Sequence, residues 1–124
     1  MEKLKGAVIG AAIEVHRTLG PGLLESAYRD CLAWELAQAG LHVYMETTQP
    51  LKYKALEIQE GYRLDLLIEQ RLIVELKAVD RLASIHEAQL RTYLRMFGTP
   101  EGLLINFNVP ILKDGIRRVT LRTQ

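Results

Sequence analysis

The sequence predicts an α/β or α+β fold in which helices flank a mixed central β-sheet. Two segments near the amino terminus and one in the second half have the apolar period of helices. Most other segments have the alternation, or the continuous apolar run, of strands. The chain has 124 residues, of which 48% are hydrophobic and 25% are charged, and this balance fits one domain spanning residues 1–124.

Two helices are predicted at the amino-terminal end. Apolar residues recur with a helical period through residues 4–18, and the "GPG" turn at Gly20–Gly22 ends that helix. A second helix is expected from about residue 23 to residue 39, with Gly40 as its stop signal. Its buried apolar stripe, including a packing thiol, is expected to be Leu24, Ala27, Cys31 and Trp34.

Strands dominate the rest of the chain. The strand segments are bounded by turn residues and comprise residues 41–46, 61–69, 71–79, 102–109 and 116–122. Residues 86–98 form a helix between the third and fourth of them. Pro50 excludes a central strand, so residues 51–59 are expected to form a strand with a turn. The predicted order is therefore α-α-β-β-β-α-β-β.

The charge balance does not by itself indicate a nucleic-acid-binding protein, because the formal net charge is only +1. The last stretch, residues 107–124, is basic, with one acid against the cations Lys113, Arg117, Arg118 and Arg122. These cations could contact phosphate, although solvated charge is the commoner explanation of such a stretch.

Targeting and redox signals point to the cytoplasm. Cys31 is the only cysteine, so no intrachain disulfide can form, and this fits a reducing compartment. The apolar run from Gly6 to Ile13 is too short to span a bilayer and lacks a cleavage site. We therefore expect a cytoplasmic protein with no membrane association.

Charged residues interrupt the two strands of the predicted hairpin. Glu75 and Lys77 lie two apart in "LIVELKAV" and share a face of a strand, and Asp65 is a lone acid in the strand before. Two carboxylates on paired strands would suit a hard cation such as Mg²⁺, with Lys77 holding a phosphate oxygen or a water. The alternative is an ion pair between Glu75 and Lys77 on a solvated face.

The loop of this hairpin decides whether the two acids share a face. A two-residue loop would set Asp65 opposite Leu76, whereas a three-residue loop at residues 69–71 would set Asp65 opposite Glu75. None of these loop residues is a Gly or Asn suited to a tight type I′ turn. We therefore expect an odd-length loop or a bulge, with both acids on one face.

The predicted helices contribute further polar residues. Glu25 lies in the first turn of the second helix, where an acid also favours the helix dipole. Gln89 and Tyr93 are four residues apart and share a face of the third helix. Tyr28 is expected to pack against the sheet with its hydroxyl bonded. His16 ends the first helix, where it can bind free carbonyls or contact the site.

Together these residues resemble the PD-(D/E)XK nuclease superfamily. Asp65, followed by Glu75-Leu76-Lys77, is similar to its D…(D/E)xK pattern, and "GLLESAY" resembles the signature of its GxxExxY branch. The resemblance extends from "IGAAIEVHRTLGPGLLESAY" through "VELKAV", "HEAQLRTYL" and "LLINFN". It implies a restriction-endonuclease-like core.

The resemblance also implies a metal site. Asp65 and Glu75 would bind Mg²⁺ or Mn²⁺, together with the backbone carbonyl of Leu76. Glu25 would complete the metal shell, directly or through water.

The resemblance implies catalytic roles as well. Lys77 would orient or activate the attacking water and stabilise the transition state. Gln89 would position substrate or water, with Tyr93 behind it. The expected function is a metal-dependent nuclease acting on DNA in preference to RNA. The alternatives are a nuclease-like binding or assembly module without turnover, and a purely structural subunit. Because no added recognition domain is visible, cleavage is expected to need a homodimer or a partner protein.

Overall fold

A computed structural model of the protein describes residues 1–121 and has the predicted order of elements. The elements are α1 (Glu2–Leu19), α2 (Glu25–Gln38), β1 (Val43–Tyr53), β2 (Leu56–Ile68), β3 (Leu72–Lys77), α3 (Ser84–Phe97), β4 (Glu101–Asn106), the short 3₁₀ helix η1 (Leu112–Gly115) and β5 (Ile116–Thr120). Arg122, in the last predicted strand and in the basic C-terminal stretch, lies outside the described residues. None of the helices in residues 1–121 has the length and apolar content needed to cross a membrane.

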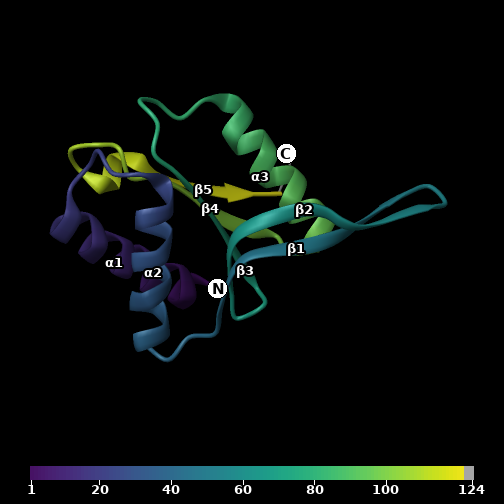
Figure 1. The fold of residues 1–124 in the computed structure, drawn as a ribbon, viewed down its shortest axis with the longest axis horizontal. Coiled ribbons are helices and arrows are strands. Elements are labelled where there is room, and N and C mark those ends of the chain that lie inside the picture. Colours follow the sequence, from purple (N-terminus) through teal and green to yellow (C-terminus); the bar gives the residue numbers. More distant parts are fainter. Residues whose placement is uncertain (122–124) are drawn as a thin grey trace.

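The five strands form one mixed sheet in the order β1-β2-β3-β4-β5. Only β3 and β4 run parallel, because α3 carries the chain from the end of one to the start of the other. The helices α1 and α2 pack on one face of the sheet and α3 packs on the other (Figure 1). This three-layer arrangement confirms the predicted fold class and agrees with a restriction-endonuclease-like core.

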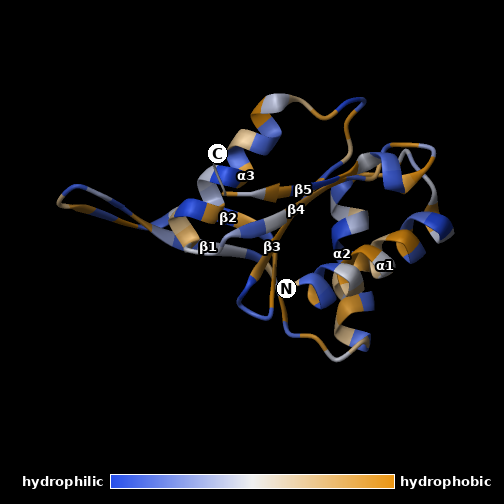
Figure 2. Ribbon diagram, turned by 180° about the vertical axis from the view of Figure 1, so that it is seen from behind, coloured by the Kyte–Doolittle hydropathy of each residue, from blue (hydrophilic) through white to orange (hydrophobic). Residues whose placement is uncertain are grey.

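The strand β3 is buried on both faces because each face is covered by helices (Figure 2). Val74 and Leu76 pack towards α1 and α2, whereas Ile73 packs towards α3. The residues after Ile73 on the α3 side are Glu75 and Lys77, since side chains two apart share a face. The two charged residues of β3 therefore follow a core residue on the α3 side of the sheet, at the end of a central strand.

The buried stripe of α2 differs from the predicted one. Tyr28, Leu32 and Leu36 face the sheet at a spacing of four residues, together with Ala33. Three predicted stripe residues are instead exposed, with Leu24 at 78% and Trp34 at 60% relative exposure and Cys31 also exposed. Apolar side chains occur on more than one side of this helix, so its period alone could not select the packed side.

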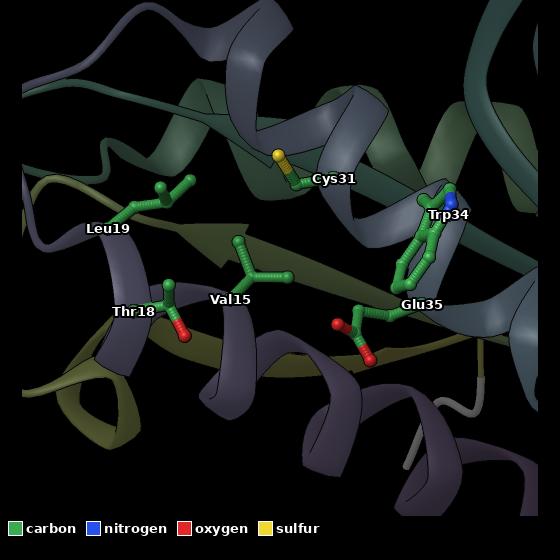
Figure 3. Close-up of a pocket in the computed structure, with 6 residues that line it drawn as sticks. All are labelled: Val15, Thr18, Leu19, Cys31, Trp34 and Glu35. Atoms are coloured by element: carbon green, nitrogen blue, oxygen red, sulfur yellow. The ribbon is translucent and has the colours of Figure 1, made fainter.

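The exposed thiol of Cys31 corrects the expectation of a buried cysteine. It lies with Trp34 beside a surface groove between α1 and α2, whose other lining residues include Val15 and Leu19 (Figure 3). The groove is remote in sequence from the acids of the hairpin and contains none of the predicted site residues.

The strands β1 and β2 continue beyond the sheet as a two-stranded arm (Figure 1). Pro50 lies at a register shift in β1, which is an edge strand, as the exclusion of Pro50 from a central strand requires. The arm turns between Tyr53 and Leu56, so residues 51–59 form the expected strand with a turn.

Candidate active site

The register of the β2–β3 hairpin sets the two acids opposite each other. Ile68 pairs with Leu72 and Leu67 pairs with Ile73, which leaves a three-residue loop at residues 69–71. The predicted odd-length loop is therefore confirmed. Two of its residues have positive φ although neither is glycine, Glu69 with 55° and Gln70 with 54°. The Glu69 carboxylate accepts a hydrogen bond from the His42 backbone N–H at 2.7 Å, which holds this turn against the start of β1.

At the acids, side chains replace the backbone ladder between β2 and β3. The last paired residues are Leu66 and Val74. Beyond them the Asp65 N–H donates to Glu75 Oε2 at 3.0 Å, and the Leu76 N–H donates to Asp65 Oδ2 at 2.9 Å. The two strands therefore separate into a fork, with one carboxylate from each strand inside it.

A rotation of β2 at Asp65 opens this fork. Tyr62 and Leu64 pack on the α3 side of the sheet, whereas Leu66 packs on the α1–α2 side. Residues two apart on a regular strand share a face, so the backbone must rotate between them, at Asp65. On β1, Glu46 lies between the two residues that pair with Leu64 and Leu66, and it has a φ of 49°. The backbone is irregular on both strands, so the regular backbone pairing is interrupted at Asp65.

Glu75 is buried and its pKa is strongly raised. Its relative exposure is only 4%. Burial first, and then the negative charge of Asp65, raises the pKa of Glu75 from 4.5 to about 8, while the positive charge of Lys77 lowers it. No ion pair within 4.0 Å joins Glu75 to Lys77 in the described chain. The alternative of a solvated Glu75–Lys77 pair is therefore wrong.

The carbonyl of Leu76 faces the fork as well. The carbonyl oxygen of Lys77 accepts from the Phe107 N–H at 2.9 Å, so the backbone groups of Lys77 point towards β4. Successive residues of a strand direct these groups to opposite sides. The N–H and C=O of Leu76 accordingly point towards β2, and the N–H does reach Asp65. The fork thus holds two carboxylates and one carbonyl.

Glu25 approaches this fork from the first turn of α2. Its side chain is half-buried. Burial and then the charge of Asp65 raise its pKa, while the positive charges of Lys77 and Arg29 lower it. Glu25 is therefore within electrostatic range of the fork.

The donor set fits a hard divalent cation with few protein ligands. Asp65 and Glu75 each use one carboxylate oxygen on a backbone N–H, and the two side chains are close enough to interact directly with each other. Within the same residues, no three side chains among His, Cys, Asp and Glu converge on one point. Mg²⁺ is commonly held by one or two carboxylates, with waters and substrate phosphate completing its shell.

A hydroxyl clamp holds the loop that precedes Glu25. The Tyr28 hydroxyl donates to the Gly20 carbonyl at 2.6 Å and accepts from the Leu23 N–H at 3.0 Å. The ring of Tyr28 is buried and stacks on Phe107, with centroids 4.6 Å apart. Gly22, between the two clamped residues, has a φ of 101°, a value that strains any residue with a side chain. The expectation that Tyr28 packs with its hydroxyl bonded is confirmed.

His16 binds a carbonyl rather than a site residue. Its Nε2 lies 2.7 Å from the carbonyl oxygen of Val109, and the side chain is buried beside Phe107. It therefore joins the end of α1 to the segment after β4.

The helix α3 places Tyr93 near the acids and Gln89 one turn away. Tyr93 is half-buried, and its pKa is raised by burial and then by the charges of Glu75 and Asp65. Gln89 is exposed on the same side of α3, and its side chain makes no hydrogen bond within residues 1–121. Tyr62 of β2 stacks on Tyr93, with ring centroids 5.2 Å apart and an interplanar angle of 22°.

Sequence reasoning missed two other residues around the fork. Arg29 pairs with Glu46 at 3.1 Å and lowers the pKa of Glu25, and its position four residues after Glu25 could have suggested this role. Asn106 is buried at the end of β4 and binds both the N–H (3.0 Å) and the C=O (2.9 Å) of Val79. It thereby fixes the backbone just after Lys77.

The comparisons with known proteins identify one family. A model described as the PD-(D/E)XK nuclease superfamily matches residues 2–119. Searches of curated proteins and of solved structures found no match. The matched range includes both strands of the fork and all three helices.

Proposed function

The chain belongs to the PD-(D/E)XK nuclease superfamily, and we propose that it is a divalent-metal-dependent nuclease that hydrolyses phosphodiester bonds of DNA in preference to RNA. The observation that carries the proposal is the fork between β2 and β3. It brings Asp65 and a buried Glu75 together, next to Lys77, at a high electrostatic cost. A sheet that served only as a scaffold would gain stability from apolar residues at these positions.

We propose that Mg²⁺ or Mn²⁺ is held by Asp65, Glu75 and the carbonyl of Leu76. Two carboxylates fall within the usual protein contribution to such sites. Glu25 would act through a bound water, because three acids do not converge within residues 1–121. When bound, the cation would polarise the phosphate and lower the pKa of an attacking water.

The side chains around the fork support the hydrolysis. Lys77 would orient the water and neutralise charge that builds on the phosphate oxygens as the P–O bond to the leaving oxygen breaks. Gln89 would contact the substrate or the water from the exposed side of α3, with Tyr93 behind it. The products would be a phosphomonoester and a hydroxyl. The whole of residues 1–124 would act as a single domain, with a second copy or a partner protein assisting cleavage.

We also infer that the chain belongs to the GxxExxY branch of the superfamily. Its motif residues Gly22, Glu25 and Tyr28 belong to one loop-and-helix unit that the Tyr28 hydroxyl holds together. The glycine allows the tight loop, the tyrosine closes the loop, and the glutamate begins the helix that follows. This mechanical coupling explains the spacing of the motif.

The decisive experiment compares plasmid cleavage by Asp65→Asn and wild type in Mg²⁺, Mn²⁺, Ca²⁺ and EDTA. We expect weak nicking in Mg²⁺ or Mn²⁺, none in EDTA, and little in Ca²⁺, whose looser coordination positions water poorly. Asp65→Asn should remove the activity, whereas the matched change Asp80→Asn, in the exposed loop after β3, should not. If wild type cleaves neither DNA nor RNA and no metal raises its melting temperature, the protein is a binding or assembly module without turnover.

A further inference from the structure

The stacked rings of Tyr62 and Tyr93 lie beside the acids, and the proposed chemistry does not use Tyr62. Both rings pack against the α3-side core, which includes Leu64 and Ile73. Leu64 directly precedes Asp65, and Ile73 lies two residues before Glu75 on the same face of β3. The aromatic pair therefore borders the fork on its α3 side.

The two tyrosines are only partly buried in the core. Each is half-buried, and neither hydroxyl has a hydrogen-bond partner within residues 1–121. The rotation of β2 at Asp65 places Tyr62 on the α3 side of the sheet. In a regular strand Tyr62 would lie on the opposite face, away from α3. A partly exposed aromatic stack is thus built next to the acids by a distortion of the strand.

Positive charge accompanies the aromatic pair. Arg63 follows Tyr62 in β2, so its side chain leaves the other face of the strand, where its largely exposed guanidinium lies 3.9 Å from Glu46. Its charge is close enough to Tyr93 to lower the pKa of that hydroxyl. Lys77 carries a second positive charge near Glu75. Aromatic rings with cations nearby are the combination by which proteins bind unpaired nucleotides, since bases stack on the rings while cations contact the backbone.

We propose that Tyr62 and Tyr93 stack with an unpaired nucleobase next to the scissile phosphodiester, so that the preferred substrate has a single-stranded nucleotide at the cleavage position. This inference rests on the proposed nuclease function and names its substrate class. Bases within a duplex are stacked on each other and cannot reach a protein ring without being flipped out. Single strands, flaps and bulges offer such a base without that cost.

The test measures binding without turnover, in Ca²⁺. The probes are a single-stranded oligonucleotide, its full duplex, and a duplex with one bulged 2-aminopurine. Wild type should bind the bulged probe more tightly than the duplex and quench its fluorescence. Tyr62→Leu should weaken binding of the bulged and single-stranded probes by about 5- to 150-fold, the range expected for one lost base–aromatic stack. Its affinity for the full duplex should change less than about twofold.

Matched variants separate stacking from folding. Tyr62→Trp retains a larger ring and should keep or strengthen binding, whereas Tyr53→Leu removes an exposed tyrosine at the tip of the arm and should change nothing. If Tyr62→Leu does not fold, Tyr62→Trp and the wild-type quenching still decide the matter. Equal binding of bulged and paired probes by wild type, or no quenching, overturns the inference.

The failure of this inference can be told from failure of the nuclease proposal. Metal-dependent cleavage with no preference for unpaired nucleotides would remove the stacking role and leave the nuclease. Quenching that depends on Tyr62, without cleavage in Mg²⁺ or Mn²⁺, would leave the aromatic site on a binding module.

Discussion

The side chain of Glu75 accepts a hydrogen bond from the backbone N–H of Asp65, with 3.0 Å between the nitrogen and Oε2. A buried acid therefore lies against the backbone of the strand that bears a second acid. One hydrogen bond only partly offsets the burial of this carboxylate and its repulsion by Asp65, since the pKa of Glu75 is still raised to about 8. The metal-free fork is the least stable when both acids are ionised.

The raised pKa of Glu75, caused by burial and then by the charge of Asp65, predicts a pH-dependent stability. The pKa of Glu75 is about 8 in the folded protein against an ordinary value of 4.5, so between these values the folded state holds a proton that the unfolded state releases. Without metal, the free energy of unfolding should therefore fall as pH rises from about 5 to about 8, by up to ~1.4 kcal/mol per unit. Thermal melts in EDTA across this range measure the slope.

Two controls accompany those melts. Mn²⁺ should raise the melting temperature most at high pH, where the carboxylates are ionised and bind a cation best. Glu75→Gln should flatten the slope, because the proton linked to folding is gone. A wild-type melting temperature in EDTA that rises between pH 5 and pH 8 would contradict the raised pKa of Glu75.

Lys77→Ala should abolish cleavage without unfolding the chain. The side chain is only half-buried and makes no ion pair within residues 1–121, so little packing is lost. Its charge should matter most when negative charge builds on the phosphate, and loss of one such interaction lowers the rate by about 10²–10³. The measurement is plasmid nicking at saturating Mg²⁺. Lys113→Ala, which changes an exposed residue of η1, should cleave as wild type does. If Lys77→Ala also cleaves fully, the observed activity arises elsewhere.

Glu25→Gln should weaken metal use rather than folding. The substitution keeps the size of the side chain and removes a charge that already suffers from burial and from Asp65. A group that acts on the metal through water typically contributes about 10–100-fold to affinity or activity. The Mg²⁺ concentration for half-maximal cleavage should rise, while Glu35→Gln on the same helix should leave it unchanged. An unaltered Mg²⁺ dependence would exclude Glu25 from the site.

Tyr28→Phe should remove the hydrogen bonds that hold the Gly20–Leu23 loop against the helix that carries Glu25. The phenylalanine can keep the stack on Phe107 but leaves the Gly20 carbonyl and the Leu23 N–H without their partner. We expect a loss of about 1–3 kcal/mol in the free energy of unfolding. We also expect a higher Mg²⁺ requirement, which a purely structural role would not produce. Tyr44→Phe removes an exposed hydroxyl and serves as the control. If Tyr28→Phe shifts stability alone, the clamp does not position Glu25.

Local sequence patterns determined much of this protein. Helical and strand periods, with glycine and proline as boundaries, predicted the order of the elements. The residues of the loop at 69–71 predicted an odd length, and the three-residue loop confirms it. These features could be predicted because they depend on contacts between residues that are close in the chain.

The tertiary structure decided which helix and strand surfaces pack together and how far the pKa of the buried acid is shifted. The period of α2 did not reveal that Tyr28, rather than Trp34, faces the sheet, because apolar side chains occur on more than one side of this helix. The rotation of β2 at Asp65, which opens the fork and pairs Tyr62 with Tyr93, depends on packing against two different helix layers. The pKa of Glu75 depends on burial by elements distant in sequence, so the sequence could place the acids but could not set their charge.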